Sequence, residues 1–286
     1  MEKIVILSGK GGVGKTMFTS WLALFLSKYK QIIAIDADVD APNLDILLQS
    51  NKIEEKKLFL SEVAEVDEDK CIGCKKCFNN CAFSAIEWDD TKNKPIMDNM
   101  LCEGCGVCKL VCPNNAISFK KINNANVDIG KTTYGFITIS GKLKPGESGS
   151  GKIVDEIKKM GEKRYPDLDM MIIDAAAGTS CPVIAAIREA NFVIGIIEPT
   201  ESSFVDLKKA IQIVENFQIH YKIIINKFDL NNKKTKEIEE YFKERDIEIL
   251  GKIPYDKNII NSIVNLKIPN LNNEELEKNI KNWLNI

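Results

Sequence analysis

The sequence lacks the features that would direct a chain to a nucleic acid, a membrane or the cell exterior. Lys and Arg total 39 and Asp and Glu total 41, so the net charge is -2 and no general attraction to nucleic acid phosphates is expected. The longest apolar stretches, residues 22–26 and 192–197, are far shorter than the roughly 18 to 20 residues that cross a bilayer. Met1 leads directly into an apolar stretch, without the parts of a secretory signal. We therefore expect a cytoplasmic protein that binds neither nucleic acid nor membrane.

Histidine is nearly absent, whereas cysteine is abundant. His220, the only histidine, stands directly before an apolar stretch, which favours a structural over a catalytic role. Of the nine cysteines, eight fall between Cys71 and Cys112, and Cys181 stands alone. Cytosolic thiols stay reduced, so they persist as metal ligands, nucleophiles or core residues. The clustering therefore indicates a local inorganic site.

Short β-branched runs alternate with segments of helical period, which is typical of βαβ units around a parallel sheet. The fold class that we expect is α/β, with a mostly parallel, doubly wound sheet. Strands are predicted at residues 3–7, 32–35, 170–173, 192–197 and 221–225. Helices are predicted at residues 15–29, 151–160, 182–190, 203–217 and 233–245, and a last helix, 273–286, is expected to pack its apolar face against the body.

Residues 67–120 interrupt this alternation with cysteines and short polar turns. We expect a small inserted α+β domain there, between residues 1–66 and 121–286 of one α/β domain. The insertion has an internal repeat, because two C-x2-C-x2-C-x3-C runs are each followed four residues later by Ala-Ile. The glycine-rich, basic segment 134–152 is expected to be a flexible loop whose task the sequence does not reveal.

Residues 9–16 read Gly-Lys-Gly-Gly-Val-Gly-Lys-Thr and match the phosphate-binding pattern G-x-x-x-x-G-K-[ST], between a predicted strand and a predicted helix. Glycines let successive N–H groups point into one concavity that suits an anionic phosphate. Lys15 is expected to contact the outer phosphates, and the Thr16 hydroxyl to bind Mg²⁺. The sequence therefore predicts a site for ATP or ADP with Mg²⁺.

Lys10 adds a basic residue that an ordinary P-loop does not require. With it, the loop resembles the deviant Walker A loop of the MinD/Mrp superfamily, relatives of the nitrogenase iron protein and of ParA-type ATPases. The resemblance also covers the stretch from Asp36 to Leu44, where that family has its first switch. It implies an ATPase that works as a homodimer, or as a heterodimer with a similar chain, in which Lys10 contacts the partner's ATP.

Three acids follow predicted parallel strands, whose carboxyl ends meet at the P-loop crevice. Asp36, Asp38 and Asp174 are therefore expected near one Mg²⁺-phosphate site, with Asp38 and Asp174 as metal-site residues beside Thr16. The resemblance implies that Asp38 positions the attacking water. Asp40 is favoured slightly as a solvated loop residue.

After Asp174 the family's second switch keeps only Gly178 of its usual Gly-Pro-Pro-Gly pattern in this chain. Further on, the resemblance implies that Asn226 and the Ile-Pro turn at Pro254 lie near the adenine base. The expected nucleotide contacts are Gly9, Lys10, Gly11, Gly12, Val13, Gly14, Lys15, Thr16, Met17, Asn226 and Pro254. The expected catalytic residues are Lys10, Lys15, Asp38 and Asp174.

The cysteine runs have the spacing of bacterial ferredoxins, in which three cysteines hold one 4Fe-4S cluster and the fourth reaches the other cluster. We assign one cluster to Cys71, Cys74, Cys77 and Cys112, and the other to Cys102, Cys105, Cys108 and Cys81. Two zinc sites are the rival interpretation, since zinc also takes four thiolates. Cys181 follows the second switch, where a nitrogenase-like cluster between subunits and a structural or redox-active thiol both remain open.

Three functions are compatible with these patterns. The first is an ATP-hydrolysing iron-sulfur protein that couples its nucleotide state to electron transfer to a redox partner. The second is an ATP-dependent carrier or assembly factor for a metal cluster, although Mrp-type relatives usually have a C-x-x-C near the C-terminus and no cysteine follows Cys181 here. The third is a positioning switch like MinD or ParA whose clusters only sense redox state.

Overall fold

A computed structural model describes all 286 residues, which form two compact units. The larger unit comprises Met1–Lys56, Val127–Lys142 and Ser150–Ile286, and the smaller one comprises Lys57–Asn126 and Leu143–Gly149. The predicted insertion, residues 67–120, lies within the smaller unit.

A nine-stranded sheet forms the centre of the larger unit, in the order β13-β12-β11-β1-β10-β2-β9-β8-β3. Every pair from β13 to β9 is parallel, because long crossovers connect the strands. The strands are β1 (Glu2–Ser8), β2 (Ile32–Ala37), β3 (Ser50–Leu58), β8 (Ala125–Thr132), β9 (Ile137–Leu143), β10 (Met170–Ala177), β11 (Phe192–Ile197), β12 (His220–Asn226) and β13 (Ile249–Ile253).

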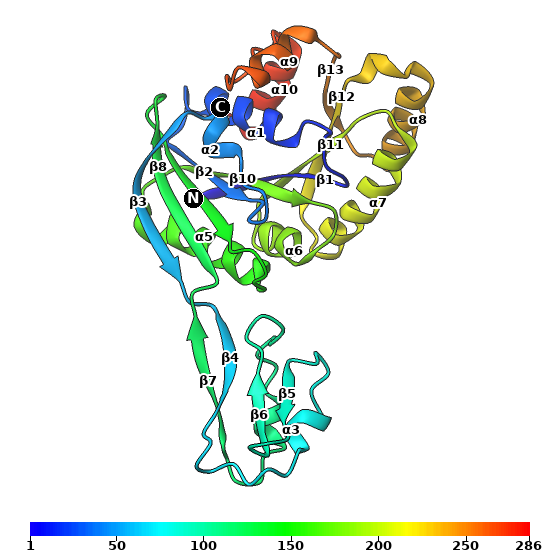
Figure 1. Cartoon of the computed structure of the whole chain (residues 1–286). Coiled ribbons are helices and arrows are strands. Elements are labelled where there is room, and N and C mark those ends of the chain that lie inside the picture. Colours follow the sequence, from blue (N-terminus) through cyan, green and yellow to red (C-terminus); the bar gives the residue numbers. More distant parts are fainter. The chain divides into compact units, whose positions relative to one another are not determined.

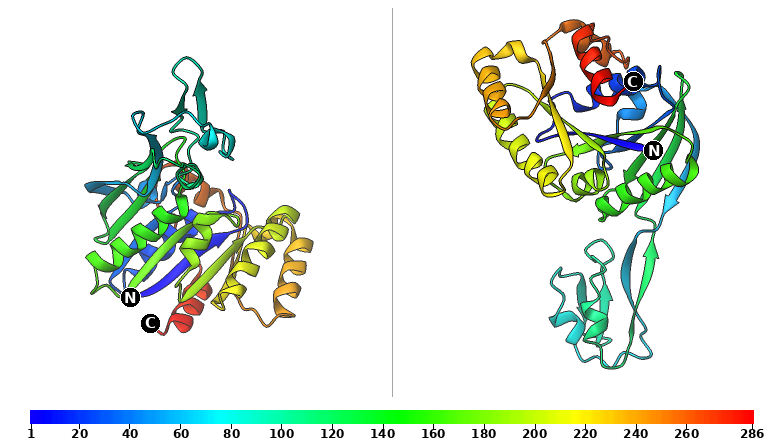
Figure 2. Two further views of the ribbon diagram at one scale, coloured as in Figure 1. Left: turned by 90° about the horizontal axis from the view of Figure 1, so that it is seen from below. Right: turned by 180° about the vertical axis from the view of Figure 1, so that it is seen from behind.

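Helices cover both faces of this sheet, as the first two views show (Figures 1 and 2). Helices α1, α2, α9 and α10 lie on one side, and α5, α6 and α7 lie on the other. The helices are α1 (Lys15–Leu26), α2 (Leu44–Leu47), α5 (Ser150–Arg164), α6 (Cys181–Ile187), α7 (Glu201–Asn216), α8 (Asn232–Lys243), α9 (Lys257–Val264) and α10 (Glu274–Leu284), with a 3-10 turn η1 (Phe228–Leu230). The mostly parallel α/β sheet is therefore confirmed.

Strands β1, β2, β10 and β11 are buried over most of their length, which explains their nearly continuous apolar sequences. Helix α10 packs against the body as expected, with Leu276, Ile280 and Leu284 buried in the same core as α1. The ring of Trp283 contacts Phe192 edge-on at a centroid distance of 5.1 Å. None of the helices is both long and apolar enough to cross a bilayer.

The expectation of a flexible loop over residues 134–152 is wrong for most of its length. Residues Ile137–Leu143 form strand β9, which pairs in parallel with β2, and α5 already begins at Ser150. Gly141 lies within this strand, where a side chain would not fit, because a Cβ there would lie 2.9 Å from the Val39 side chain. The glycine in a strand therefore reflects close packing and not flexibility.

The smaller unit contains two antiparallel strand pairs and two short helices. Strand β4 (Ser61–Val66) pairs with β7 (Ile117–Ile122), and β5 (Ile86–Asp89) pairs with β6 (Lys94–Met97). The helices are α3 (Lys76–Asn79) and α4 (Val107–Leu110). A small core of Ala64, Cys77, Ile86, Cys108 and Ile117 holds the unit together.

A short second segment, Leu143–Gly149, completes the smaller unit. The backbone N–H of Lys144 donates to the carbonyl of Asn124 at 3.0 Å, and the fully buried amide of Asn124 donates to the carbonyl of Ser148 at 3.0 Å. The hydroxyl of Ser61 donates to the same carbonyl at 3.2 Å. This strap therefore belongs to the hydrogen-bond network of the unit.

Candidate functional site

The P-loop connects the end of β1 to the first turn of α1. Gly14 precedes the helix with φ 95°, a conformation that favours glycine. Gly9 has a different reason, because a Cβ there would lie 2.1 Å from the backbone nitrogen of Leu207 in α7. Two of the glycines are thus required by the path of the loop between its neighbours.

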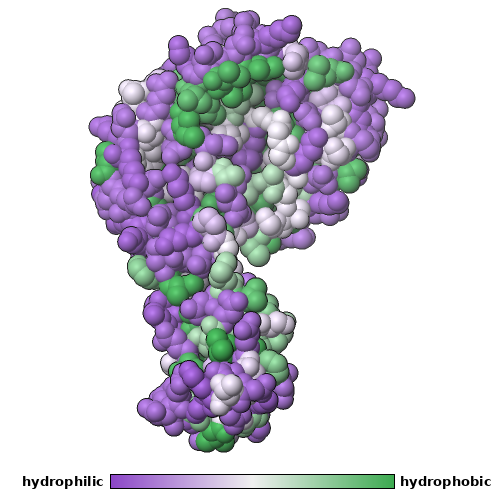
Figure 3. All heavy atoms as spheres, in the orientation of Figure 1, coloured by the Kyte–Doolittle hydropathy of each residue, from purple (hydrophilic) through white to green (hydrophobic).

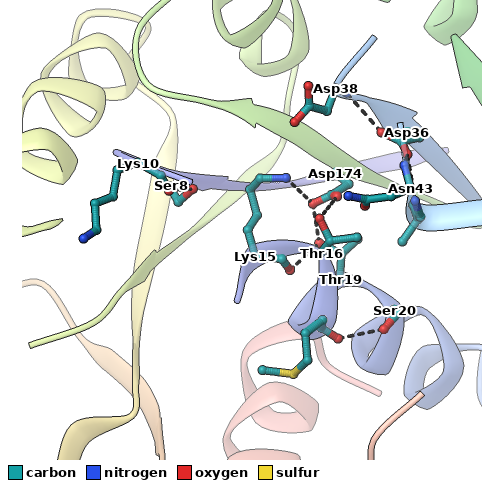
Figure 4. A network of polar contacts seen from close by, with 12 residues as sticks. Ser8, Lys10, Lys15, Thr16, Thr19, Ser20, Asp36, Asp38, Asn43 and Asp174 are labelled. Carbon is teal, nitrogen blue, oxygen red and sulfur yellow. Dashed lines mark hydrogen bonds and ion pairs between the residues drawn. The ribbon is translucent and has the colours of Figure 1, made fainter. Parts of the chain in front are cut away.

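Asp174 of β10 is the common acceptor behind this loop, as Figure 4 shows. Its carboxylate accepts from Lys15 Nζ at 2.7 Å, from Thr16 Oγ1 at 2.6 Å and from Thr19 Oγ1 at 2.8 Å. Asp174 is fully buried and Lys15 is 7% exposed, so the ion pair lies in a region of low dielectric constant. The loop lysine and hydroxyl are thereby held in place from behind.

Thr19 was not predicted as a site residue. It follows Thr16 by less than one helical turn and therefore lies on the same face of α1. That spacing was the signal in the sequence that it shares a partner with Thr16.

Asp36 lies beside Asp174 in the neighbouring strand β2, in register with it. Its carboxylate accepts from the backbone N–H of Asp38 at 3.1 Å, and from those of Asn43 and Leu44 at 2.8 Å each. Burial, together with repulsion from Asp174, raises the pKa of Asp36 to about 7. Asp36 thus fastens the segment 38–44, the expected first switch, to the end of its strand.

A cleft of about 510 Å³ opens in front of the P-loop. Its polar lining includes Lys10, Lys15, Thr16 and Asp38, and apolar residues of α2 and α9 line the remainder. Asp38 is half-buried, and burial raises the pKa of its carboxyl against the attraction of Lys15. The cleft has the size of a site for a small molecule and combines cations, a hydroxyl and a carboxylate.

The apolar part of the cleft continues onto the surface. Figure 3 shows a band of hydrophobic surface along the upper part of the larger unit, where Figure 1 places α9. Ile263 and Leu266 line the cleft, while Val264 is 73% exposed. Sequence reasoning missed this helix, because its apolar residues are interrupted by asparagines and a serine.

Lys10 lies in the same loop but points away from the Asp174 network (Figure 4). Its ammonium forms an ion pair with Glu198 at 2.9 Å and donates to Ser202 Oγ at 3.2 Å. Glu198 also pairs with Lys227 at 2.9 Å. Burial opposes ionisation of Glu198, but the hydrogen bonds from Lys227 and Lys10 outweigh it and lower the pKa of this carboxyl. Within one chain, Lys10 therefore already has an anionic partner.

The residues that were expected near the base brace the loop and its surroundings. The buried amide of Asn226 donates to the Val13 carbonyl at 2.8 Å, and Lys227 Nζ donates to the Gly12 carbonyl at 3.2 Å. Pro254 is exposed between β13 and α9, and the next N–H, that of Tyr255, donates to Asp229 at 2.7 Å. Contact of Asn226 and Pro254 with a base stays a prediction.

The second switch leaves β10 at Ala177, which lines the cleft. Gly178 has φ 90°, and its N–H donates to the Ser8 carbonyl at 2.9 Å, which ties the segment to the end of β1. Cys181 is exposed at the first position of α6. Both roles of this thiol, in a cluster between subunits or as a structural or redox-active cysteine, stay predictions.

The eight cysteines of the smaller unit line two small cavities. One cavity is lined by Cys71, Cys74, Cys77 and Cys112, and the other by Cys81, Cys102, Cys105 and Cys108. These are the two sets of four that the spacing of the runs predicts. A backbone N–H reaches a thiol at each cavity, from Ala116 to Cys112 Sγ at 3.3 Å and from Ala64 to Cys102 Sγ at 3.4 Å.

The thiols surround their cavities and do not converge on a point. No group of three or more His, Cys, Asp or Glu side chains is placed to hold a single metal ion. The innermost cysteine of each cavity is buried, and burial raises the pKa of the thiols of Cys77 and Cys108. Each cavity thus presents four sulfur donors around a common space.

Comparisons with known proteins agree with the fold. An uncharacterized protein of Methanocaldococcus jannaschii, MJ0578, is 38% identical over 98% of this chain and 94% of its own length. The solved structure of the septum site-determining protein MinD complexed with Mg-ADP, from Pyrococcus horikoshii, superposes with a TM-score of 0.60 at 16% identity and covers 99% of this chain and 95% of that one.

A shorter similarity concerns another protein class. The indolepyruvate oxidoreductase subunit IorA of Pyrococcus abyssi is 43% identical over 65 residues, which are 23% of this chain and 10% of that subunit.

The family model for the CobQ/CobB/MinD/ParA nucleotide binding domain matches residues 4–269. The chain therefore belongs to the CobQ/CobB/MinD/ParA family of P-loop nucleotide-binding ATPases.

Proposed function

We propose that this protein is an ATP-dependent redox protein, which binds and hydrolyses ATP in the P-loop cleft and holds two 4Fe-4S clusters in its smaller unit. The observation that carries the proposal is the division of eight cysteines into two sets of four, each around its own cavity. The family supplies the nucleotide half of the proposal. The local similarity to an oxidoreductase subunit supports the redox half.

The cleft residues have separate roles in this proposal. Lys15 and Thr16 now donate to Asp174, and both are placed to exchange this acceptor for phosphate and Mg²⁺ when a nucleotide enters. Asp174 then holds the metal site from behind, and Asp38 faces the cleft, where it orients the attacking water. Gly9, Gly11, Gly12, Val13, Gly14 and Met17 form the backbone cradle for the phosphates.

The cysteine cavities fit an iron-sulfur cluster better than a zinc ion. A single zinc ion requires four sulfurs about 2.3 Å from one point, whereas here the thiols surround a space and no group converges on one ion. Each cluster, when bound, supplies one-electron redox chemistry. The cysteines of each set hold it, while the backbone N–H groups of Ala64 and Ala116 donate to ligand sulfurs.

The chain itself links the two activities. Asp36 fastens the segment 38–44, which leads directly into α2, then β3, and from there into the smaller unit. Movement of this segment upon ATP binding or hydrolysis therefore acts on the strand that enters the cysteine-bearing unit. This covalent path is the basis for coupling between nucleotide state and electron transfer.

The dimer is a further part of the proposal. Lys10 must leave Glu198 to reach a partner's nucleotide, and Lys227 remains with Glu198 when it does so. We therefore expect ATP to promote pairing of two copies, or of this chain with a similar one. Size-exclusion chromatography with ATP and with ADP, on wild type and on Lys10→Ala, tests this, and an ATP-dependent dimer that persists unchanged in Lys10→Ala contradicts the role of Lys10.

Anaerobic purification followed by iron and sulfide analysis tests the redox half. We expect about eight irons and eight sulfides per chain, since two four-iron clusters are proposed. Zinc in place of iron, or no bound metal after anaerobic reconstitution, would refute it. Transfer of all iron to an apo-acceptor upon ATP addition would instead indicate the cluster-carrier function.

Reduction potentials test the coupling. They are measured without nucleotide, with ADP and with a non-hydrolysable ATP analogue, alongside ATP turnover in the oxidised and reduced protein. Lys15→Ala, which removes the phosphate contact, is the matched control and should make the potentials insensitive to nucleotide. Potentials and turnover that do not respond to the other site would exclude coupling.

A further inference from the structure

The smaller unit is built from two copies of one motif, and the strand registers show which residues correspond. In one pair Trp88 of β5 lies opposite Pro95 of β6, and in the other Phe119 of β7 lies opposite Ala64 of β4. Trp88 and Phe119 each follow the Ala-Ile of their repeat by the same number of residues. Trp88 and Phe119 are therefore equivalent positions of the two copies.

The two cysteine cavities can be compared through this correspondence. Trp88 lines the cavity of Cys71, Cys74, Cys77 and Cys112, and Phe119 lines the other. The four cysteines, the Ala-Ile pair and the aromatic position are shared between the copies. The two cavities therefore have these lining positions in common, and the positions at which they differ can be compared directly.

The first difference is a hydrogen-bond donor. The indole nitrogen of Trp88, Nε1, is fully buried and has no acceptor within the chain. Phe119 has no such donor. A buried N–H without a partner is unfavourable, and native structures rarely keep one. Trp88 lines a cavity together with four thiols, so sulfur acceptors border the same space as this unpaired donor.

The second difference is charge. Lys75 lines the Trp88 cavity, with its ammonium 5.0 Å from the centroid of the Trp88 ring, and its equivalent in the other copy is Gly106. Lys94 Nζ donates to the Cys71 carbonyl. In the other cavity Glu103 takes the place of Ile72. The Lys75 ammonium also pairs with the exposed Asp90 at 3.2 Å. The charge difference between the cavities is therefore a partly compensated cation at the Trp88 cavity and the Glu103 carboxylate at its counterpart.

We propose that the indole N–H of Trp88 donates to a sulfur of the cluster held by Cys71, Cys74, Cys77 and Cys112, and that with Lys75 it gives this site the higher reduction potential of the two. This inference rests on the proposed iron-sulfur function. Hydrogen bonds to the sulfurs and nearby cations stabilise the reduced, more negative state of a cluster. The electron shared by the two sites consequently resides in the Trp88 cavity.

A redox titration followed by electron paramagnetic resonance tests the proposal on the whole chain. Wild type should show two different potentials, and Trp88→Phe, which copies the residue of the other cavity, should lower only the higher one. We expect about a tenfold change in relative electron occupancy, or about 59 mV for a one-electron couple. Trp283→Phe, the same substitution in α10, is the control and should change neither potential. An unchanged higher potential in Trp88→Phe overturns the proposal.

A second measurement does not depend on how well the variant folds. Tryptophan labelled with ¹⁵N in the indole enters Trp21, Trp88 and Trp283, of which only Trp88 belongs to the smaller unit. The reduced wild type should show hyperfine coupling between the ¹⁵N nucleus and the electron spin of the higher-potential site. Absence of this coupling in a protein with about eight irons refutes the role of Trp88, whereas absence of iron refutes the underlying function instead.

Discussion

Replacement of the P-loop lysine by methionine tests how much the buried Lys15–Asp174 ion pair stabilises the protein. Lys15→Met removes the cation that lies 2.7 Å from the buried Asp174 carboxylate, and leaves that carboxylate with only two hydroxyl donors. Removal of one partner of a buried ion pair costs about 3–5 kcal/mol, because the other charge stays buried without compensation. We therefore expect the free energy of unfolding of the nucleotide-free protein to fall by about 4 kcal/mol.

Lys10→Met is the matched control in the same loop. The Lys10 side chain is 31% exposed, and Glu198 keeps its pair with Lys227 when Lys10 is removed. The loss should stay below about 1 kcal/mol, as for partly exposed ion pairs. Urea unfolding at pH 7.5, followed by circular dichroism without nucleotide, measures both values. Equal losses in the two variants would show that burial of the Lys15–Asp174 pair does not decide its strength.

The pH dependence gives this prediction a second readout. Lys15 attracts the neighbouring Asp36 carboxylate and lowers its pKa against the effects of burial and of Asp174. Without Lys15, the Asp36 carboxylate takes up a proton more readily. The destabilisation in Lys15→Met should therefore shrink between pH 7.5 and pH 5.5, because protonation removes the uncompensated charge.

Three further predictions concern the same unit. Gly9→Ala should lower the free energy of unfolding by about 2 kcal/mol or more, because its Cβ would overlap the α7 backbone. Gly11→Ala, which has open space around it, should have little effect. Urea unfolding of both variants checks this, and similar losses would contradict it. Burial, with repulsion from Lys3, lowers the pKa of Lys158 to about 8, below its usual 10.5. Between pH 8 and pH 10.5 the unfolded state therefore binds more protons than the folded state, and the free energy of unfolding should rise by about 3 kcal/mol over this range. Lys158→Met should abolish the rise, and a rise that persists in the variant would exclude Lys158 as its source. The pKa of Asp36 is raised to about 7 from 3.8, so the folded state binds the extra proton and wild-type stability should decrease as the pH rises from 4 to 7; a decrease of the same size in Asp36→Asn would assign it to other groups.

The parallel strands and the cysteine sets were predictable from the sequence because their signals are local. Strands buried on both faces are almost continuously apolar, as in Phe192–Ile197, and this pattern does not depend on the rest of the chain. The division of the cysteines into two sets of four follows from the ferredoxin spacing, in which the fourth cysteine of each run joins the first three of the other run. Wherever a short stretch of sequence determines the geometry, prediction is possible.

Other parts depend on distant partners and were not predictable. Strand β3 is mostly exposed and rich in Lys and Glu, so it has no apolar signature. The Glu198 partner of Lys10 lies far along the chain in sequence, and only the parallel order of β1 and β11 brings the two together. The role proposed for Trp88 was not predictable either, because only the structure shows that its indole N–H is buried without an acceptor.

The strap of Leu143–Gly149 has a consequence for any attempt to transplant the cysteine-bearing unit. A gene fragment that encodes only residues 57–126 would leave the buried amide of Asn124 without the Ser148 carbonyl that it now binds. The unit is discontinuous in sequence, so a graft into another scaffold must carry both pieces and two pairs of junctions. If the unit arose by insertion of residues 57–126 at one point of an α/β domain, then the segment Leu143–Gly149 of that domain must have become part of the inserted unit afterwards.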